Sequence, residues 1–274
     1  MSNRMFARTS ATGELAAQII GRLEESGKDI QRLTTRDLAS VDEFHFRGRH
    51  ATLELAEKMR LTSRSKVLDI GSGLGGPART IAHQYRCRVT GVDVTPAFCE
   101  AAQEMSGWVR LSELVHFTHG DALELPFEDA SFDAAMSIHV AMAIEAKDQL
   151  YAEAKRVLKD GSIFAVYDVV KGEGGAVRFP VPWARTPDIS HLATPDRMKA
   201  LLRGAGFKII EIKDSTAESQ KWFEETRLRN GRSAGRTSKS FHALIGKDFP
   251  GATQNQIINL GERRIRTVTY VCEA

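Results

Sequence analysis

The stretch "VLDIGSGLGGPAR", residues 67–79, decides the fold. It opens with a short apolar run that is typical of a buried strand. Gly71, Gly73 and Gly76 follow with the spacing G-x-G-x-x-G of a nucleotide-binding loop. Pro77 then stands at the first turn of a helix, where its missing N–H costs nothing. The stretch therefore predicts a strand, a tight glycine turn and a helix whose N-terminus faces a ligand.

Apolar runs and helical patterns alternate along the rest of the chain. Six further runs have the length and composition of strands: 87–94, 114–120, 132–138, 162–170, 207–214 and 265–273. Thr194-Pro195 marks one helix start, and Ser215 with Glu218 forms a capping-box pattern for another helix, which we expect to end before Gly231. This alternation favours a doubly wound α/β fold with a mostly parallel, Rossmann-like sheet of seven strands.

The first 60 residues contain no such strands. Apolar residues recur at helical spacing in three segments, 13–26, 36–44 and 51–59. We expect residues 1–60 to form an N-terminal helical cap and residues 61–274 to form the main α/β domain. Two longer stretches, about 171–193 and 231–262, interrupt the alternation, and we expect them to act as lids over a ligand pocket.

Composition narrows the class of protein. A chain of 274 residues with 42% hydrophobic content can form one large domain with its own core. A net charge of +3 is too small to indicate nucleic-acid binding. Cys87, Cys99 and Cys272 are scattered and odd in number, which argues against a disulfide framework or a zinc site. The sequence has neither a run of about 18 apolar residues nor an apolar signal segment near its start. We expect a cytoplasmic protein with a small-molecule substrate, no metal and no nucleic-acid or membrane partner, and a homodimer is one option.

Asp69 discriminates between two classes of nucleotide ligand. It lies two residues before Gly71, at the C-terminal end of the expected strand. Dinucleotide-binding proteins place a pyrophosphate here, and an ionised carboxylate about 4 Å away would oppose it by about 4 kcal/mol at an effective dielectric constant near 20. The same carboxylate would suit the α-ammonium group of S-adenosylmethionine. We therefore expect a cationic nucleoside ligand at the glycine loop.

Two further acids end the next two strands. Asp93 lies about 20 residues after the loop, where an acidic residue binds ribose hydroxyls in either class of ligand. Asp121 follows the third strand, and its carboxylate could accept a hydrogen bond from an adenine amino group held between Val94 and Leu123. Caps and turns are the alternative explanation, above all for Asp121.

Four motifs carry a family resemblance. In order, "VLDIGSGLGGPAR", "VTGVDVTPAF", "GDALELPFEDASFDAAMS" and "VLKDGSIFAVYD" resemble the successive motifs of class I S-adenosylmethionine-dependent methyltransferases, over roughly residues 66–215. "GLGGPAR", "VDEFHFRGRHAT", "PVPWA" and "NLGERRIRTV" resemble the small-molecule branch that contains sarcosine/dimethylglycine N-methyltransferases and phosphoethanolamine-type enzymes.

The resemblance implies S-adenosylmethionine as the cofactor and the residues that contact it. These are Asp69, Gly71, Ser72, Gly73, Asp93, Val94, Asp121, Ala122 and His139. After the fourth strand the chain has "IHVAMAI" in place of an Asn/Asp-Pro-Pro-Tyr motif, which disfavours the methylation of adenine or glutamine amides.

Candidates for catalysis follow from the chemistry of methyl transfer. Because the sulfonium is already activated, the protein mainly aligns the reactants and excludes water, and a general base can assist. His139 follows the fourth strand, Tyr167 ends the fifth, and His45 lies in "EFHFRG" within the cap. We expect these three side chains to line the methyl-transfer site, with packing roles as the alternative.

Phe44, Arg47 and Trp183 are candidates for binding the acceptor. Arg47 could pair with a carboxylate, and the Trp183 indole could receive a methylammonium group by a cation–π contact. With the resemblance, this favours N-methylation of a small amine or amino acid of the glycine or sarcosine kind. O- or C-methylation of a quinone, phenol or polyketide-like metabolite is the alternative, and a strongly apolar pocket would favour it. A nicotinamide-dependent oxidoreductase and a non-catalytic cofactor-binding protein are the remaining options.

Overall fold

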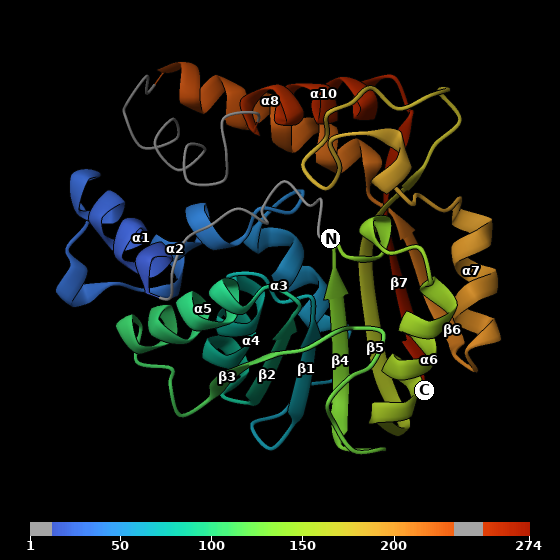
Figure 1. Cartoon of the computed structure of the whole chain (residues 1–274), viewed down its shortest axis with the longest axis horizontal. Coiled ribbons are helices and arrows are strands. Elements are labelled where there is room, and N and C mark those ends of the chain that lie inside the picture. Colours follow the sequence, from blue (N-terminus) through green and yellow to red (C-terminus); the bar gives the residue numbers. More distant parts are fainter. Residues whose placement is uncertain (1–12, 233–248) are drawn as a thin grey trace.

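The computed structural model describes residues 13–232 and 249–274. A seven-stranded sheet forms its centre, with helices on both faces (Figure 1). The strands are β1 (Lys66–Ile70), β2 (Arg88–Asp93), β3 (Val115–His119), β4 (Phe132–Ile138), β5 (Leu158–Lys171), β6 (Lys208–Asp214) and β7 (Ile265–Glu273). Their order is β3-β2-β1-β4-β5-β7-β6, and β7 runs antiparallel to the other six strands. The predicted doubly wound, mostly parallel fold is confirmed.

Helices bury both faces of the sheet. They are α1 (Glu14–Glu25), α2 (Thr35–Asp42), α3 (Arg49–Glu57), α4 (Gly76–Tyr85), α5 (Pro96–Trp108), α6 (Lys147–Val157), α7 (Pro195–Gly204), α8 (Thr216–Arg232) and α10 (Phe249–Gly261). Side chains alternate along a strand, so Val67 belongs to the core cluster that includes residues of α3 and α4, while Leu68 belongs to the one that includes residues of α6 and α7. Tyr167 shares the α3 face of the sheet, and Asp168 points to the other face.

The N-terminal helices pack beside the sheet. Leu15, Ile19 and Leu23 form one stripe of α1, which contacts Ala101 and Met105 of α5. Helix α2 packs against α4. None of the helices in the described residues is both long and apolar enough to cross a membrane.

Two helices and one loop cover the end of the sheet at which the parallel strands finish. In Figure 1, α8 and α10 lie side by side across this end, next to the yellow insert that follows β5. Of the second expected lid, 231–262, residues 233–248 lie outside the described residues, and most of the remainder forms α10.

Two local predictions about α8 are wrong. The helix continues through Gly231 to Arg232, because a single glycine inside a helix costs only about 1 kcal/mol and does not by itself end it. The Ser215 hydroxyl contacts Thr267 of β7, and the Asp214 carboxylate accepts the Thr216 N–H instead. Tertiary contacts with β7 therefore replace the expected capping box.

Candidate active site

The glycine loop follows β1 and is bonded to the end of β2, and Gly73 within it has open space around it. Gly71, Gly73 and Gly75 have φ angles of 73°, 53° and 76°, which favour glycine. The Gly71 N–H donates to the Val92 carbonyl at 2.8 Å. A Cβ at Gly71 would lie 2.4 Å from the Val140 side chain, whereas a Cβ at Gly73 would meet nothing within 4 Å. Space for a ligand therefore lies at Gly73.

Asp69 is a buried carboxyl group with one oxygen that lacks a partner among the described residues. It is 1% exposed, and its Oδ2 has no hydrogen-bond partner among the described residues. Burial raises the pKa of Asp69 to about 8, and the nearby carboxylates of Asp93 and Glu43 add to the rise. Burial therefore outweighs the pull of Arg79 and favours the neutral form of this carboxyl when no cation lies beside it. A cation bound beside Oδ2 would restore the ionised form.

Asp93 joins the glycine loop to the next helix. Its Oδ2 accepts the Gly73 N–H at 3.0 Å, and its Oδ1 accepts the Thr95 N–H at 2.9 Å. Val94 is 41% exposed, an unusual position for a large apolar side chain next to a buried acid. The buried acids, the open glycine and this exposed apolar residue fit an amino-acid nucleoside with a positive charge.

Asp121 lies in a turn, which was the alternative to a role in adenine binding. Its Oδ1 accepts the Leu123 N–H at 2.9 Å, and the side chain is exposed. Ala122 is half-buried beside it, and the Ser72 hydroxyl, in the glycine loop, is buried without a hydrogen-bond partner among the described residues. The orphaned hydroxyl adds a second polar atom that a ligand could satisfy.

The three catalytic candidates lie together. His139 follows β4 with a φ of 56°, and its N–H donates to the Tyr167 carbonyl at 2.8 Å. Its ring centroid lies 5.9 Å from that of His45, 5.3 Å from that of Phe46 and 5.1 Å from that of Tyr167. Phe223 of α8 packs on Phe46 at 5.2 Å. We call these five side chains the ring cluster.

The titratable rings of this cluster are uncharged near pH 7. Burial lowers the pKa of His45 to about 4, and the hydrogen bond to the Gly48 carbonyl only partly opposes it. Burial and the neighbouring His45 hold the pKa of His139 well below its usual value. Burial raises the pKa of Tyr167, whose hydroxyl contacts Ser219 at 3.3 Å. The cluster thus offers neutral imidazoles and a protonated phenol.

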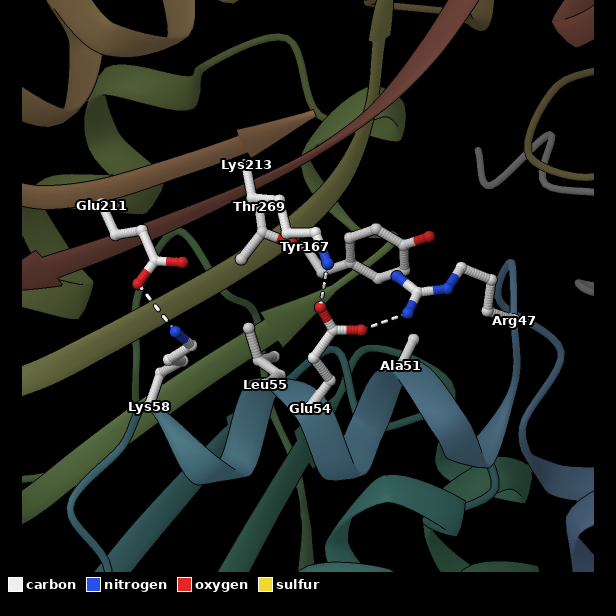
Figure 2. Close-up of a pocket in the computed structure, with 9 residues that line it drawn as sticks. All are labelled: Arg47, Ala51, Glu54, Leu55, Lys58, Tyr167, Glu211, Lys213 and Thr269. Carbon is white, nitrogen blue, oxygen red and sulfur yellow. Dashed lines mark hydrogen bonds and ion pairs between the residues drawn. The ribbon is translucent and has the colours of Figure 1, made fainter. Parts of the chain in front are cut away.

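Arg47 lies beside the ring cluster, and its guanidinium forms an ion pair with the Glu54 carboxylate. Figure 2 shows the Glu54 carboxylate between Arg47 and Lys213, and it pairs with both. These residues line a small pocket with Tyr167. The guanidinium therefore has its anionic partner inside the protein.

Trp183 and Phe44 do not join the ring cluster. The Trp183 indole is 6% exposed, and its N–H donates to the Ser190 hydroxyl at 3.0 Å. Phe44 is 40% exposed. The indole anchors the insert after β5 within the core.

Of the residues that hold the ring cluster in place, the sequence marked only Asp168, as an acid at the end of the fifth strand that could orient or deprotonate an amine. Asp168 accepts the Ala141 N–H at 2.7 Å and the Val169 N–H at 2.8 Å, which fixes the turn after His139. Phe46 and Phe223 are two of its walls. An apolar pattern does not distinguish such walls from ordinary core residues. The one available signal was Asp168, an acid inside the apolar run of β5.

Sequence comparisons identify the family. The family described as "Methyltransferase domain" matches residues 68–166. An O-methyltransferase, cnsE of Penicillium expansum, is 32% identical over 197 residues, which are 69% of this chain and 69% of that protein. A sterol 24-C-methyltransferase of Debaryomyces hansenii is 35% identical over 116 residues, 42% of this chain and 31% of that longer protein.

A solved structure supports the fold. Phosphoethanolamine N-methyltransferase 2 of Haemonchus contortus, in complex with S-adenosyl-L-methionine, matches with a TM-score of 0.71 and 19% identity. The match covers 88% of this chain and 57% of that one, and at this identity it shows the fold alone. The sequence matches confirm the resemblance to methyltransferases, and the solved structure that shares this fold holds S-adenosyl-L-methionine, the cofactor expected from the sequence. The chain belongs to the S-adenosylmethionine-dependent methyltransferases.

Proposed function

We propose that this methyltransferase acts on a hydroxyl oxygen of a largely apolar small molecule. The observation that carries the proposal is the ring cluster, because it surrounds His139 with aromatic rings and uncharged nitrogens. Apolar rings favour an acceptor with little charge. This choice differs from the small amine or amino acid that the resemblance favoured.

The arginines near the ring cluster support the same choice. A glycine- or sarcosine-like acceptor carries a carboxylate, which needs a cation or several N–H donors. Arg47 is paired with Glu54, and Arg49 donates to Thr80 and lies 3.8 Å from Glu43. Releasing Arg49 would take the nearby cation away from the buried Glu43 carboxylate, which is costly, and releasing Arg47 would break its pair with the half-buried Glu54.

Different residues would contact the cofactor and the acceptor. S-adenosylmethionine, when bound, supplies a methyl group on a positively charged sulfur that leaves as a neutral thioether. The carboxyl of Asp69 would accept its ammonium group, and Asp93 and the open Gly73 would hold the nucleoside. On the acceptor side, a neutral imidazole of His45 or His139 would take the hydroxyl proton, and Tyr167 would form one wall.

Two other acceptors keep some support. The names of relatives include both O- and C-methyltransferases, so carbon is a second possible atom. The aromatic rings could also hold an alkylammonium group by cation–π contacts, which keeps the amine as a candidate.

A matched acceptor panel tests the proposal. Phenols, hydroxylated terpenoids and polyketide-like alcohols would be compared with sarcosine-like amines, scoring S-adenosylhomocysteine release and the methylated atom. We expect turnover of an apolar hydroxylated acceptor, and a loss of about 100-fold or more in kcat for the His45→Ala, His139→Ala double variant. His116→Ala, on the exposed part of β3, is the control. Turnover of the amines alone would refute the proposal, and tight cofactor binding without any turnover would favour a non-catalytic role.

A further inference from the structure

A buried carboxylate stands behind one of the two imidazoles. Glu43 lies in the loop between α2 and α3, and its side chain is 0% exposed. Its Oε2 accepts the Thr52 hydroxyl at 2.6 Å, and its Oε1 accepts the Thr80 hydroxyl at 2.7 Å. Arg49 lies 3.8 Å from the same carboxylate. Both oxygens are therefore occupied by groups of α3 and α4.

These contacts determine which nitrogen of His45 carries the proton. His45 Nε2 lies 2.9 Å from the Gly48 carbonyl and 3.1 Å from the Thr52 hydroxyl oxygen. The carbonyl can only accept, and the Thr52 hydroxyl donates its one hydrogen to Glu43. Nε2 must therefore be the donor, and the lone pair of the neutral ring is on Nδ1.

His139 has no such arrangement. Its Nε2 is buried and has no hydrogen-bond partner among the described residues, so no described contact at this nitrogen fixes the tautomer. Its ring stands 5.9 Å from that of His45, and Tyr167 stands 6.3 Å from His45. Of the two imidazoles, His45 is the one whose orientation and tautomer the protein fixes in advance.

We propose that Thr52 and Glu43 are positioning residues that hold His45 as the Nε2–H tautomer, so that Nδ1 takes the proton of the acceptor hydroxyl. The inference rests on the proposed function. The O–H bond breaks and its hydrogen becomes the Nδ1 proton. The oxygen's electron pair forms the new bond to the methyl carbon as the methyl–sulfur bond breaks, and the sulfur keeps that bond's electron pair and leaves as a neutral thioether. Glu43, 3.9 Å from Nε2, stabilises the imidazolium that results.

Thr80 connects the Glu43 carboxylate to the helix that follows the glycine loop. Thr80 lies on α4, which begins in the glycine loop, and it donates to the same carboxylate as Thr52. The charged and titratable groups near His45 are Glu43, Arg47, His139 and Tyr167, and Arg49 lies beside Glu43. One carboxylate thereby joins the orientation of the base to the helix that follows the cofactor loop.

Two Thr52 variants separate positioning from simple packing. Thr52→Val keeps the shape and removes the hydroxyl, whereas Thr52→Ser keeps the hydroxyl. We expect Thr52→Val to lower kcat for the best acceptor by about tenfold to a hundredfold, with acceptor KM and S-adenosylhomocysteine affinity changed less than about threefold. Thr52→Ser should restore most of the kcat. Thr90→Val in β2 is the control for the same change outside the site.

A measurement without turnover keeps the inference separate from the proposed function. Long-range ¹H–¹⁵N spectra of the full chain report each histidine tautomer, with His45 assigned by its loss in His45→Gln. We expect the Nε2–H form for His45, whatever the acceptor. An Nδ1–H form, or full kcat in Thr52→Val, would overturn the inference even if the hydroxyl acceptor is methylated. Failure of every hydroxylated acceptor, with the Nε2–H form present, would refute the proposed function and the proton transfer to Nδ1, leaving only the tautomer.

Discussion

The Arg79 guanidinium lies 2.8 Å from the Asp42 carboxylate, and the two side chains are 0% and 2% exposed. Arg79 also donates to the Ala102 carbonyl of α5 at 2.9 Å and to the Leu74 carbonyl of the glycine loop. Burial raises the pKa of Asp42 to about 6, and the positive charge of Arg79 opposes this rise. One buried cation therefore joins α2, α5 and the glycine loop.

Removing this cation should destabilise the fold. Arg79→Met leaves Asp42 and two carbonyls without their donor, and we expect the free energy of unfolding to fall by about 3–5 kcal/mol. Urea unfolding followed by circular dichroism measures the change. Arg36→Met, on the exposed side of α2, is the matched control and should change stability by less than about 0.5 kcal/mol. Equal, small effects of both variants would mean that the buried pair does not stabilise the fold.

The Asp69 carboxyl should matter for binding the cofactor. Asp69→Asn keeps the size of the side chain but cannot become negative, so a bound ammonium loses its charged partner. We expect S-adenosylhomocysteine to bind more weakly by about 1.5–3 kcal/mol, the scale of one charge-assisted hydrogen bond. Asp160→Asn, exposed before the buried part of β5, is the control in the same calorimetric titration. Unchanged affinity in Asp69→Asn would contradict the assigned role.

Binding should also release a proton. The pKa of Asp69 is about 8 in the protein by itself, so the carboxyl is mostly protonated at pH 7. An ammonium beside Oδ2 favours the ionised form, and up to one proton should leave when S-adenosylhomocysteine binds at pH 7. Calorimetry in two buffers of different ionisation enthalpy measures the number of protons released. The same heat in both buffers would show that Asp69 does not ionise on binding.

Much of the fold followed from the order of apolar runs and glycines. The strand β7 was expected at 265–273, where it lies, and β4 at 132–138. These runs are bounded by turns and buried on both faces, so local pattern and tertiary structure agree. Strand β5 differs from its prediction, 162–170. It begins earlier, at Leu158 directly after α6, because Leu158 pairs with Phe132 of β4 although the residues that follow it have no apolar pattern.

The candidate site was only partly visible in the sequence. His45, His139 and Tyr167 come from three distant segments. His139 and Tyr167 meet because β4 and β5 are parallel neighbours, whereas His45 reaches them from the loop between α2 and α3. The roles of Glu43 and Thr52 depend on distances across a loop, which no spacing encodes. Trp183 illustrates a further limit of sequence reasoning, because the sequence alone does not show whether an indole is buried or exposed. The sequence therefore predicted the polar residues at the strand ends, but it did not predict the contacts that support them.

Stability should fall between pH 6.5 and 8. Burial raises the pKa of Asp69 to about 8 and that of Asp168 to about 7, above the ordinary value of 3.8. In this window the folded protein holds protons that the unfolded chain has already lost, so the free energy of unfolding decreases as pH rises. Below pH 6.5, the lowered pKa of His45 acts in the opposite direction. Urea unfolding at several pH values measures the slope, and Asp69→Asn should flatten it. A stability that rises through this window would refute the assignment of neutral carboxyls.

The contact between Gly71 and Val140 should limit what the glycine loop tolerates. Gly71→Ala places a Cβ 2.4 Å from the Val140 side chain at a φ of 73°, so the loop must move. Gly161→Ala is a matched control, because Gly161 has a φ of 74° and open space around it. Both variants carry a strain of about 1–2 kcal/mol from the left-handed backbone. Only Gly71→Ala should also weaken S-adenosylhomocysteine binding, by more than about tenfold, or 1.4 kcal/mol. If both variants bound the ligand with wild-type affinity in calorimetry, the loop would not be the cofactor cradle.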